Sequence, residues 1–132
     1  MKRFIFLIAC TFSLTLLNCQ QAKQNSVVET IAPEAFEQLL EKQTVQLVDV
    51  RTLEEFQEEH IEAAINMDFL APSFIEEIDK LDKDQPVLIY CRSGKRSANS
   101  IEQFQQVGFK KIVNLDGGIL NWKSEGFPVT SQ

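Results

Sequence analysis

Short runs of apolar residues alternate with segments of helical period along most of the chain. Five runs have the length and content of strands, at 27–30, 45–50, 63–66, 87–90 and 112–115. The segments after them carry apolar residues on one helical face, at 33–40, 53–58, 74–81, 97–107 and around Trp122. Continuously apolar runs are typical of strands that are buried on both faces. The pattern therefore predicts an α/β fold with a central parallel sheet of about five strands and helices on both faces.

Length and composition agree with one ordinary globular domain. The chain has 132 residues, which favours a single domain, and 44% of them are hydrophobic. The formal net charge is −6, so the basic face of a nucleic-acid-binding protein is not expected. Against this acidic background, three cations stand close together in the sequence, namely Arg92, Lys95 and Arg96.

The first residues have the pattern of an export signal. Lys2 and Arg3 form a positive start, and the apolar run 4–17 follows. That run is shorter than the roughly 18 residues of a membrane-spanning helix, and it matches the apolar core of a secretory signal. We therefore expect an exported protein on the periplasmic side of a bacterial membrane.

The signal ends in a sequence that resembles a bacterial lipobox, in which the cysteine is lipidated and becomes the mature N-terminus. The residues are Leu-Leu-Asn-Cys at 16–19, with Asn18 where Gly, Ala or Ser is usual. Ordinary cleavage and a retained N-terminal anchor are the alternatives. The predicted organisation is a signal peptide at 1–18, a polar tether at 19–26 after the lipidated Cys19, and one domain at 27–132.

Processing at this point would leave one free thiol in the mature chain. Cys10 would be removed with the signal and Cys19 would carry the lipid, so Cys91 would have no partner for an intramolecular disulfide. One histidine and one free cysteine do not supply the ligands of a protein metal site. We expect no metal and no cofactor.

The segment 87–97 carries the candidate chemistry. A buried strand delivers Cys91 to its carboxyl end, Gly94 allows a tight turn, and a helix begins. Ligands bind at this edge of open α/β sheets. Backbone N–H groups of such a turn and the positive end of the helix both favour a thiolate at the cysteine. The neighbouring cations would raise the positive potential further.

Four segments in order resemble the single-domain rhodaneses. The loop Cys-Arg-Ser-Gly-Lys-Arg-Ser at 91–97 is similar to the active-site loop of that family. The other three are Asp49-Val50-Arg51 with Glu55-Phe56, His60-Ile61 with 64–66, and Asp116-Gly117-Gly118 with Trp122. The similarity extends from about residue 31 to 129 and implies the rhodanese fold. Two departures fall in one loop, where Glu59 replaces a usual Gly and Glu62-Ala63 replaces Pro-Gly.

The resemblance implies a sulfurtransferase. Cys91 would take sulfane sulfur from a small anionic donor such as thiosulfate, and would pass it from a persulfide to an external thiol or cyanide. The residues expected to bind the donor are Arg92, Ser93, Gly94, Lys95 and Arg96. The residues expected to support the loop are Asp49, Arg51 and Ser97. We expect a monomer that contacts the membrane through the lipid at Cys19 and does not bind nucleic acid.

Other readings of the same residues give different functions. Phosphatases with this type of cradle need Cys-x5-Arg, whereas Arg96 follows Cys91 after four residues and Ser97 occupies the arginine position. A non-catalytic rhodanese-like binding or regulatory module at the cell envelope is the main alternative. His60 could act as a base for the cysteine, although the resemblance favours a structural role. The acidic run at 54–59 predicts a solvated helix face.

Overall fold

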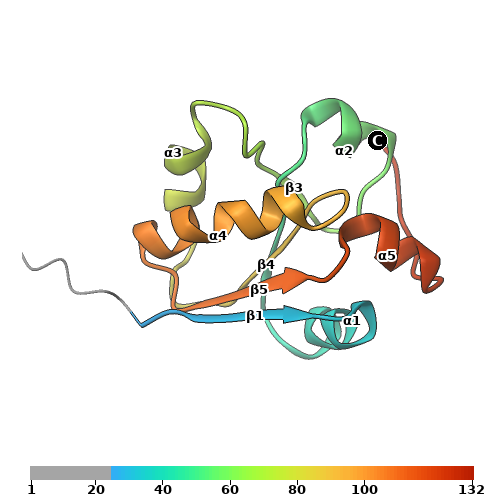
Figure 1. Ribbon diagram of the computed structural model, residues 1–132, viewed down its shortest axis with the longest axis horizontal. Coiled ribbons are helices and arrows are strands. Elements are labelled where there is room, and N and C mark those ends of the chain that lie inside the picture. Colours follow the sequence, from blue (N-terminus) through green and yellow to red (C-terminus); the bar gives the residue numbers. More distant parts are fainter. Residues whose placement is uncertain (1–24) are drawn as a thin grey trace, which may run out of the picture.

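The computed structural model describes residues 25–132, which form a five-stranded sheet with helices on both faces (Figure 1). The strands, all parallel, lie in the order β1-β5-β4-β2-β3. Their bounds are β1 Val27–Ile31, β2 Gln46–Asp49, β3 Ile65–Asn66, β4 Val87–Tyr90 and β5 Lys111–Leu115. The predicted signal at 1–18, the lipidated Cys19 and the tether up to residue 24 lie outside the described residues. In the part of the chain that is described, no helix has the length and apolar character needed to cross a membrane.

Five helices connect and cover these strands. Their bounds are α1 Pro33–Lys42, α2 Leu53–Glu58, α3 Phe74–Asp79, α4 Lys95–Val107 and α5 Gly118–Ser124. Helices α3 and α4 pack on one face of the sheet, and α1 and α5 pack on the other. The predicted fold class is therefore confirmed. The expected start of α4 at Ser97 was wrong, because Gly94 adopts φ 100° and the helix begins directly after it at Lys95.

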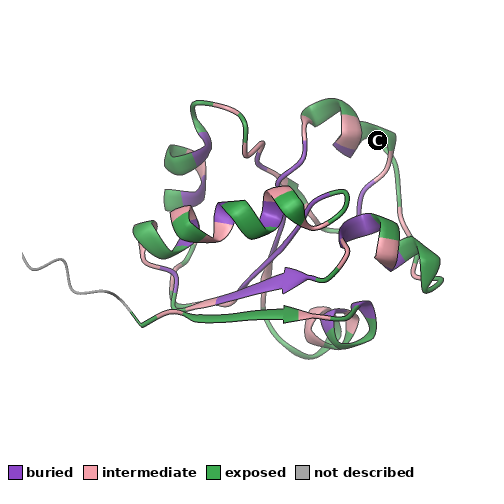
Figure 2. Cartoon of the chain, in the orientation of Figure 1, coloured by how far each residue is buried: buried purple, intermediate pink, exposed green. Residues whose placement is uncertain are grey.

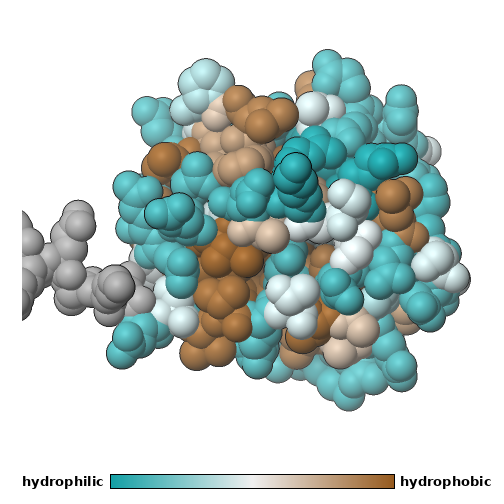
Figure 3. All heavy atoms as spheres, in the orientation of Figure 1, coloured by the Kyte–Doolittle hydropathy of each residue, from teal (hydrophilic) through white to brown (hydrophobic). Residues whose placement is uncertain are grey.

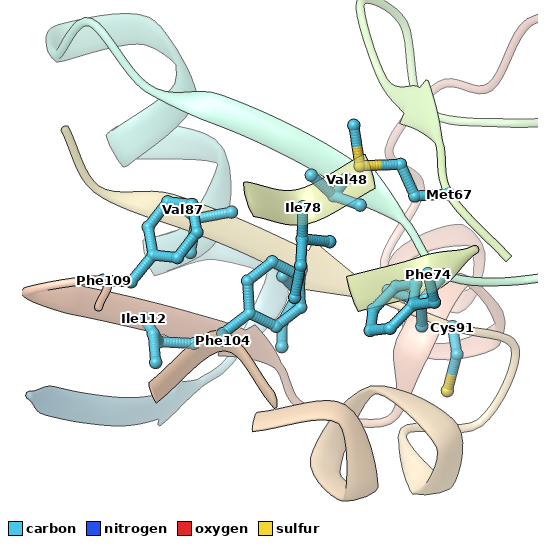
Figure 4. Packing of buried hydrophobic residues seen from close by; sticks show 11 residues of the cluster. Val48, Met67, Phe74, Ile78, Val87, Cys91, Phe104, Phe109 and Ile112 are labelled. Atoms are coloured by element: carbon cyan, nitrogen blue, oxygen red, sulfur yellow. The ribbon is translucent and has the colours of Figure 1, made fainter. Parts of the chain in front are cut away.

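Strand β4 lies in the middle of the sheet and is buried on both faces. Val87, Ile89 and Cys91 belong to the cluster beneath α3 and α4, in which Figure 4 labels Val87 and Cys91. Leu88 and Tyr90 point into the cluster beneath α1 and α5. Successive side chains of a strand alternate between faces, so a strand without solvent on either side must be apolar throughout. This burial fixes the strand that carries the cysteine.

Strand β1 is the exposed edge of the sheet. It is mostly exposed, whereas β5 beside it is mostly buried (Figure 2). Val27 and Val28 are exposed on β1, and hydrophobic side chains gather on the surface beside β1 and below α4 (Figure 3). This edge lies two strands away from β4 in the sheet order, so it does not border the cysteine.

Helix α2 begins with a complete capping box. The Thr52 side chain accepts a hydrogen bond from the Glu55 N–H at 3.3 Å, and the Glu55 carboxylate accepts one from the Thr52 N–H at 3.1 Å. A capping box satisfies two N–H groups that would have no partner inside the helix. It also fixes the position of the Glu55 carboxylate, which has a second partner in the loop around the cysteine.

Candidate active site at Cys91

The Cys91 sulfur lies at the carboxyl end of β4 in a short hydrogen-bonded loop. The residue is 1% exposed. Its sulfur points away from the aromatic side chains of the cluster (Figure 4). The Gly94 N–H donates to the sulfur at 3.0 Å. An N–H aimed at sulfur stabilises the charged thiolate more than the neutral thiol.

Ser97 supplies a second polar group beneath the loop. Its hydroxyl oxygen lies 3.4 Å from the Cys91 sulfur and 3.2 Å from the Gly94 carbonyl oxygen. A hydroxyl has one hydrogen, so it donates either to the carbonyl or to the sulfur. Donation to the sulfur is favoured when the sulfur is charged. Ser97 thus contacts both the sulfur and the loop backbone.

The first turn of α5 orients the peptides that follow the cysteine. The N–H groups of Ile119 and Leu120 donate to the carbonyl oxygens of Cys91 and Arg92, at 2.9 and 3.1 Å. These N–H groups are among those that a helix start leaves without internal partners. In a trans peptide the N–H points opposite to the C=O, so the N–H groups of Arg92 and Ser93 point away from α5.

Gly118 makes this contact possible. It adopts φ 62°, and a Cβ on it would lie 2.5 Å from the carbonyl oxygens of both Cys91 and Arg92. No side chain fits at that distance. The backbone of α5 therefore rests directly on the backbone of the cysteine loop, and only glycine permits this packing.

Arg96 is held by a carboxylate of α2. Its two terminal nitrogens donate to the two carboxylate oxygens of Glu55 at 2.7 and 2.8 Å. Two parallel hydrogen bonds of this kind fix the planes of both groups. The bonds to Arg96, together with those from Thr52, lower the pKa of Glu55 to about 2. The pair joins the start of α4 to the start of α2.

Of the three loop cations, Arg92 and Lys95 remain for a ligand. Both are exposed. The ion pairs found between residues 25 and 132 do not include either of them. The predicted binding of a donor by Arg92, Ser93, Gly94, Lys95 and Arg96 stays a prediction, and the structure adds that the Arg96 guanidinium is already engaged.

Asp49 and Arg51 form a buried ion pair behind the loop. The Arg51 side chain donates to the Asp49 carboxylate at 2.7, 3.0 and 3.1 Å, and it also donates to the Glu59 carbonyl oxygen at 2.6 Å. The bond to Glu59 holds the segment after α2, and support of the cysteine loop by Asp49 and Arg51 stays a prediction. The Arg51 guanidinium also lies 5.7 Å from the centre of the Tyr90 ring. Burial, with the nearby Asp49 charge, raises the pKa of Tyr90 above its usual range.

His60 has a structural environment. Its ring stacks on Phe56 with 3.9 Å between centroids, and Nδ1 lies 2.8 Å from the Phe56 carbonyl oxygen. A carbonyl oxygen can only accept, so Nδ1 carries the hydrogen. The His60 backbone pairs with Thr130 through two hydrogen bonds of 2.8 Å. These contacts fasten the C-terminal segment to the end of α2.

The loop at 59–63, where the departures from the rhodanese pattern fall, is held by other contacts. Glu59 forms an ion pair with Lys123 of α5. Ala63 adopts φ 66°, a conformation that favours glycine, and its side chain is exposed. The usual Gly at this position is therefore explained by the backbone, and Ala63 keeps the conformation at a cost of about 1 kcal/mol.

Two features of the site were not predicted from the sequence. The acidic run was expected to face solvent, but Glu55 and Glu59 bind Arg96 and Lys123. The sequence places Gly118 in a motif but assigns no role to it. The capping pattern from Thr52 to Glu55 could have indicated that the Glu55 carboxylate is fixed. Its partner could not have been found, because Arg96 is 41 residues away in the sequence.

Metal ligands do not gather around the cysteine. Within residues 25–132, no three His, Cys, Asp or Glu side chains lie close enough together to hold a metal ion. Cys91 is the free cysteine of this described part, and it is buried.

The fold and the site define a small parallel α/β domain with a cysteine loop at the carboxyl edge of its sheet. A family model described as the rhodanese-like domain matches residues 32–125. The chain therefore belongs to the rhodanese-like domain family. A crystal structure of a rhodanese-related protein from Thermoplasma volcanium superposes with a TM-score of 0.70 at 28% identity, covering 79% of this chain and 99% of that one.

Similar sequences include proteins named as sulfurtransferases. A sulfurtransferase of Allochromatium vinosum is 36% identical over 107 residues, which are 80% of this chain and 97% of that protein. A thiosulfate sulfurtransferase of Coxiella burnetii is 35% identical over 91 residues, 69% of this chain and 82% of that protein. A Synechocystis protein is 38% identical over 101 residues, 75% of this chain but only 54% of that protein. This chain thus spans about half of that last relative.

Proposed function

We propose that the chain is a sulfurtransferase that moves sulfane sulfur through a persulfide on Cys91. The observation that carries this proposal is the Gly94 N–H placed 3.0 Å from the Cys91 sulfur at the end of a buried strand. A fixed donor stabilises negative charge on that sulfur before transfer, and on the persulfide after transfer. The names of the relatives from Allochromatium vinosum and Coxiella burnetii support sulfur transfer, with thiosulfate as one donor.

The reaction has two half-steps that share the same sulfur atom. The Cys91 thiolate attacks the outer sulfur of thiosulfate, a new S–S bond forms, and the S–S bond of the donor breaks with its electron pair leaving on sulfite. An acceptor then attacks the outer sulfur of the persulfide. With cyanide, the product is thiocyanate, and the electron pair of the broken S–S bond returns to the Cys91 thiolate.

The charges around the loop divide into two roles in this proposal. Arg92 and Lys95 are exposed and meet the negative donor. Arg96 is paired with Glu55 and positions the first turn of α4, which begins at the residue after Gly94. Long-range attraction by the exposed pair would be screened by salt, so we expect thiosulfate turnover to fall as ionic strength rises.

The acceptor is an outside molecule in this proposal. Cys91 is the free cysteine of residues 25–132, so the described part of the chain offers no second thiol to take the sulfur. A small thiol or a thiol of another protein would complete the cycle. We propose a monomer that needs no cofactor.

The cellular location proposed here comes from the amino-terminal sequence alone. The positive start, the short apolar run and Cys19 support export and a lipid anchor on the periplasmic side of a bacterial membrane. Cys19→Ala should release the protein from the membrane fraction into the soluble periplasmic fraction. Unchanged fractionation of the variant would contradict the lipid anchor.

Thiocyanate formation from thiosulfate and cyanide tests the proposed activity. Parallel double-reciprocal plots are expected, because the donor product leaves before the acceptor binds. Cys91→Ser should abolish turnover and keep the fold. Asn99→Ser, at an exposed position of α4, is the matched control and should keep the parent rate. A folded protein that forms no thiocyanate would favour the non-catalytic binding module instead.

A further inference from the structure

A hollow with an apolar floor lies on the opposite side of the sheet from the Cys91 sulfur. Leu40 of α1, Ile61, Trp122 of α5 and Pro128 line it, with a volume of about 180 Å3. Ile61 and Trp122 are almost fully buried, at 3% and 2% exposed, so they form the floor. A hollow of this size has room for one side chain rather than for a large ligand.

Three glutamates and no basic residue complete the lining. Glu37 and Glu41 stand one helical turn apart on α1, and Glu62 belongs to the loop that follows α2. Like charges at this spacing destabilise a helix. The Glu41 carboxylate, through its hydrogen bond and its charge, raises the pKa of Glu37, and Lys42 offsets this only partly. The ion pairs found between residues 25 and 132 do not include any of the three.

We propose that this hollow binds an arginine or lysine side chain on a basic segment of a partner protein. The long aliphatic stem of such a side chain would pack on Leu40 and Trp122, and its charged end would lie among the glutamates. Charge complementarity around an apolar floor gives both orientation and specificity. A small amine would gain little, because exposed carboxylates bind a lone cation weakly.

The position of the hollow allows its occupant to bind without blocking the cysteine. Cys91 belongs to the cluster beneath α3 and α4, whereas Ile61 and Trp122 belong to the cluster beneath α1 and α5. Glu62 stands where the rhodanese pattern often has proline, so one of the three charges is a departure of this chain from that pattern. An occupant of the hollow would therefore leave the Cys91 sulfur uncovered.

Trp122 allows a direct test, because it is the only tryptophan in the chain. The probe is an acetylated tetrapeptide of sequence Leu-Arg-Arg-Leu, titrated into the purified full chain while tryptophan fluorescence is recorded. A saturable change is expected with this peptide and none with the same peptide carrying citrulline, which has the shape of arginine without the charge. Raised salt should weaken the binding.

Variants of the rim separate the hollow from general acidity. Glu37→Gln with Glu41→Gln should weaken peptide binding by at least about fivefold, and Glu62→Gln by a smaller factor. Glu54→Gln with Glu58→Gln removes two exposed charges of the same spacing from α2 and should leave binding unchanged. Urea denaturation of each variant checks that it is folded, so the test does not depend on sulfur transfer.

Several results would overturn the proposal. Binding that responds equally to arginine and citrulline, or that survives the double substitution on α1, would exclude the glutamate rim. A matching signal from spermidine would indicate a site for small amines. A tryptophan signal that depends on protein concentration, with a dimer in sedimentation, would mean that a second copy of the chain covers the hollow.

Discussion

Two loops contact the end of strand β4, and their surroundings at the left-handed positions are very different. The loop at 91–97 has glycine at its left-handed position, Gly94, and backbone packed directly on its carbonyl groups by Gly118. The loop at 59–63 has Ala63 in the left-handed conformation, with its side chain exposed. It touches β4 through one bond of 3.0 Å, from the Ile61 N–H to the Tyr90 hydroxyl. A position packed backbone to backbone, as at Gly118, requires glycine, whereas the exposed position of Ala63 requires only a left-handed backbone conformation.

The largest effect is expected from Gly118→Ala. The new Cβ would lie 2.5 Å from two carbonyl oxygens of the cysteine loop, at φ 62°. Overpacking and left-handed strain together should lower the free energy of unfolding by about 3 kcal/mol and reduce sulfur transfer. Urea denaturation and thiocyanate formation measure the two effects.

Gly126→Ala is the matched control for this substitution. Gly126 adopts φ 84°, but a Cβ on it would meet no atom within 4 Å. Gly126→Ala should therefore lower the free energy of unfolding only by its conformational strain, about 1 kcal/mol. Equal losses in the two variants would mean that the close contact between α5 and the cysteine loop does not matter.

Ser97→Ala should have the next largest effect. The substitution removes the hydroxyl near the Cys91 sulfur and leaves the Gly94 carbonyl without that donor. We expect unfolding to become easier by about 1 kcal/mol and thiosulfate turnover to fall several-fold. Asn99→Ala, at an exposed position on the same helix, is the control. Parent turnover in Ser97→Ala would show that the sulfur is stabilised by backbone N–H groups alone.

Glu55→Gln tests the ion pair that joins the cysteine loop to α2. The pKa of Glu55 is lowered from 4.5 to about 2 by its bonds to Arg96. Because folding favours the ionised carboxylate, its contribution to the free energy of unfolding is complete above pH 4.5. This contribution is lost as pH falls from 4.5 towards about 2. The variant should lose about 1 kcal/mol at neutral pH and show a flatter stability profile in that acid range.

Glu54→Gln serves as the control for the acid range, because Glu54 is an exposed neighbour on the same helix. It should keep the parent profile. If Glu55→Gln also kept that profile, the carboxylate would be titrating normally and the pair would not hold α4 in place.

The smallest effect is expected in the other loop. Ala63→Gly removes left-handed strain but increases the freedom of the unfolded chain, so a net stabilisation of about 0.5 kcal/mol is expected. Ala98→Gly, in the interior of α4, should destabilise the chain by about 1 kcal/mol. A loss of stability in Ala63→Gly would contradict the strain assigned to that loop.

The sequence predicted the parts of this molecule that depend on local pattern. All five strands, the helices between them and the placement of Cys91 after a buried strand follow from apolar runs and turn residues. The order of the strands, the partner of Arg96 and the contact of Gly118 with the cysteine loop did not follow. These features join positions far apart in the sequence, such as Glu55 and Arg96 at a separation of 41 residues, and no local period encodes them.

The acidic run on α2 shows how a local pattern can mislead. Four glutamates in six positions predict a solvated face, and Glu54 and Glu58 are indeed exposed. Glu55 and Glu59 form ion pairs with residues of α4 and α5 instead. Which glutamates point towards another helix depends on the packing of the whole sheet.

The mass of the intact protein tests the central claim most directly. After incubation with thiosulfate, the folded chain should gain one sulfur atom, and cyanide should remove that atom as thiocyanate. Cys91→Ser should gain nothing under the same conditions. A folded parent chain that gains no sulfur, or a Cys91→Ser variant that gains as much as the parent, would contradict a persulfide on Cys91.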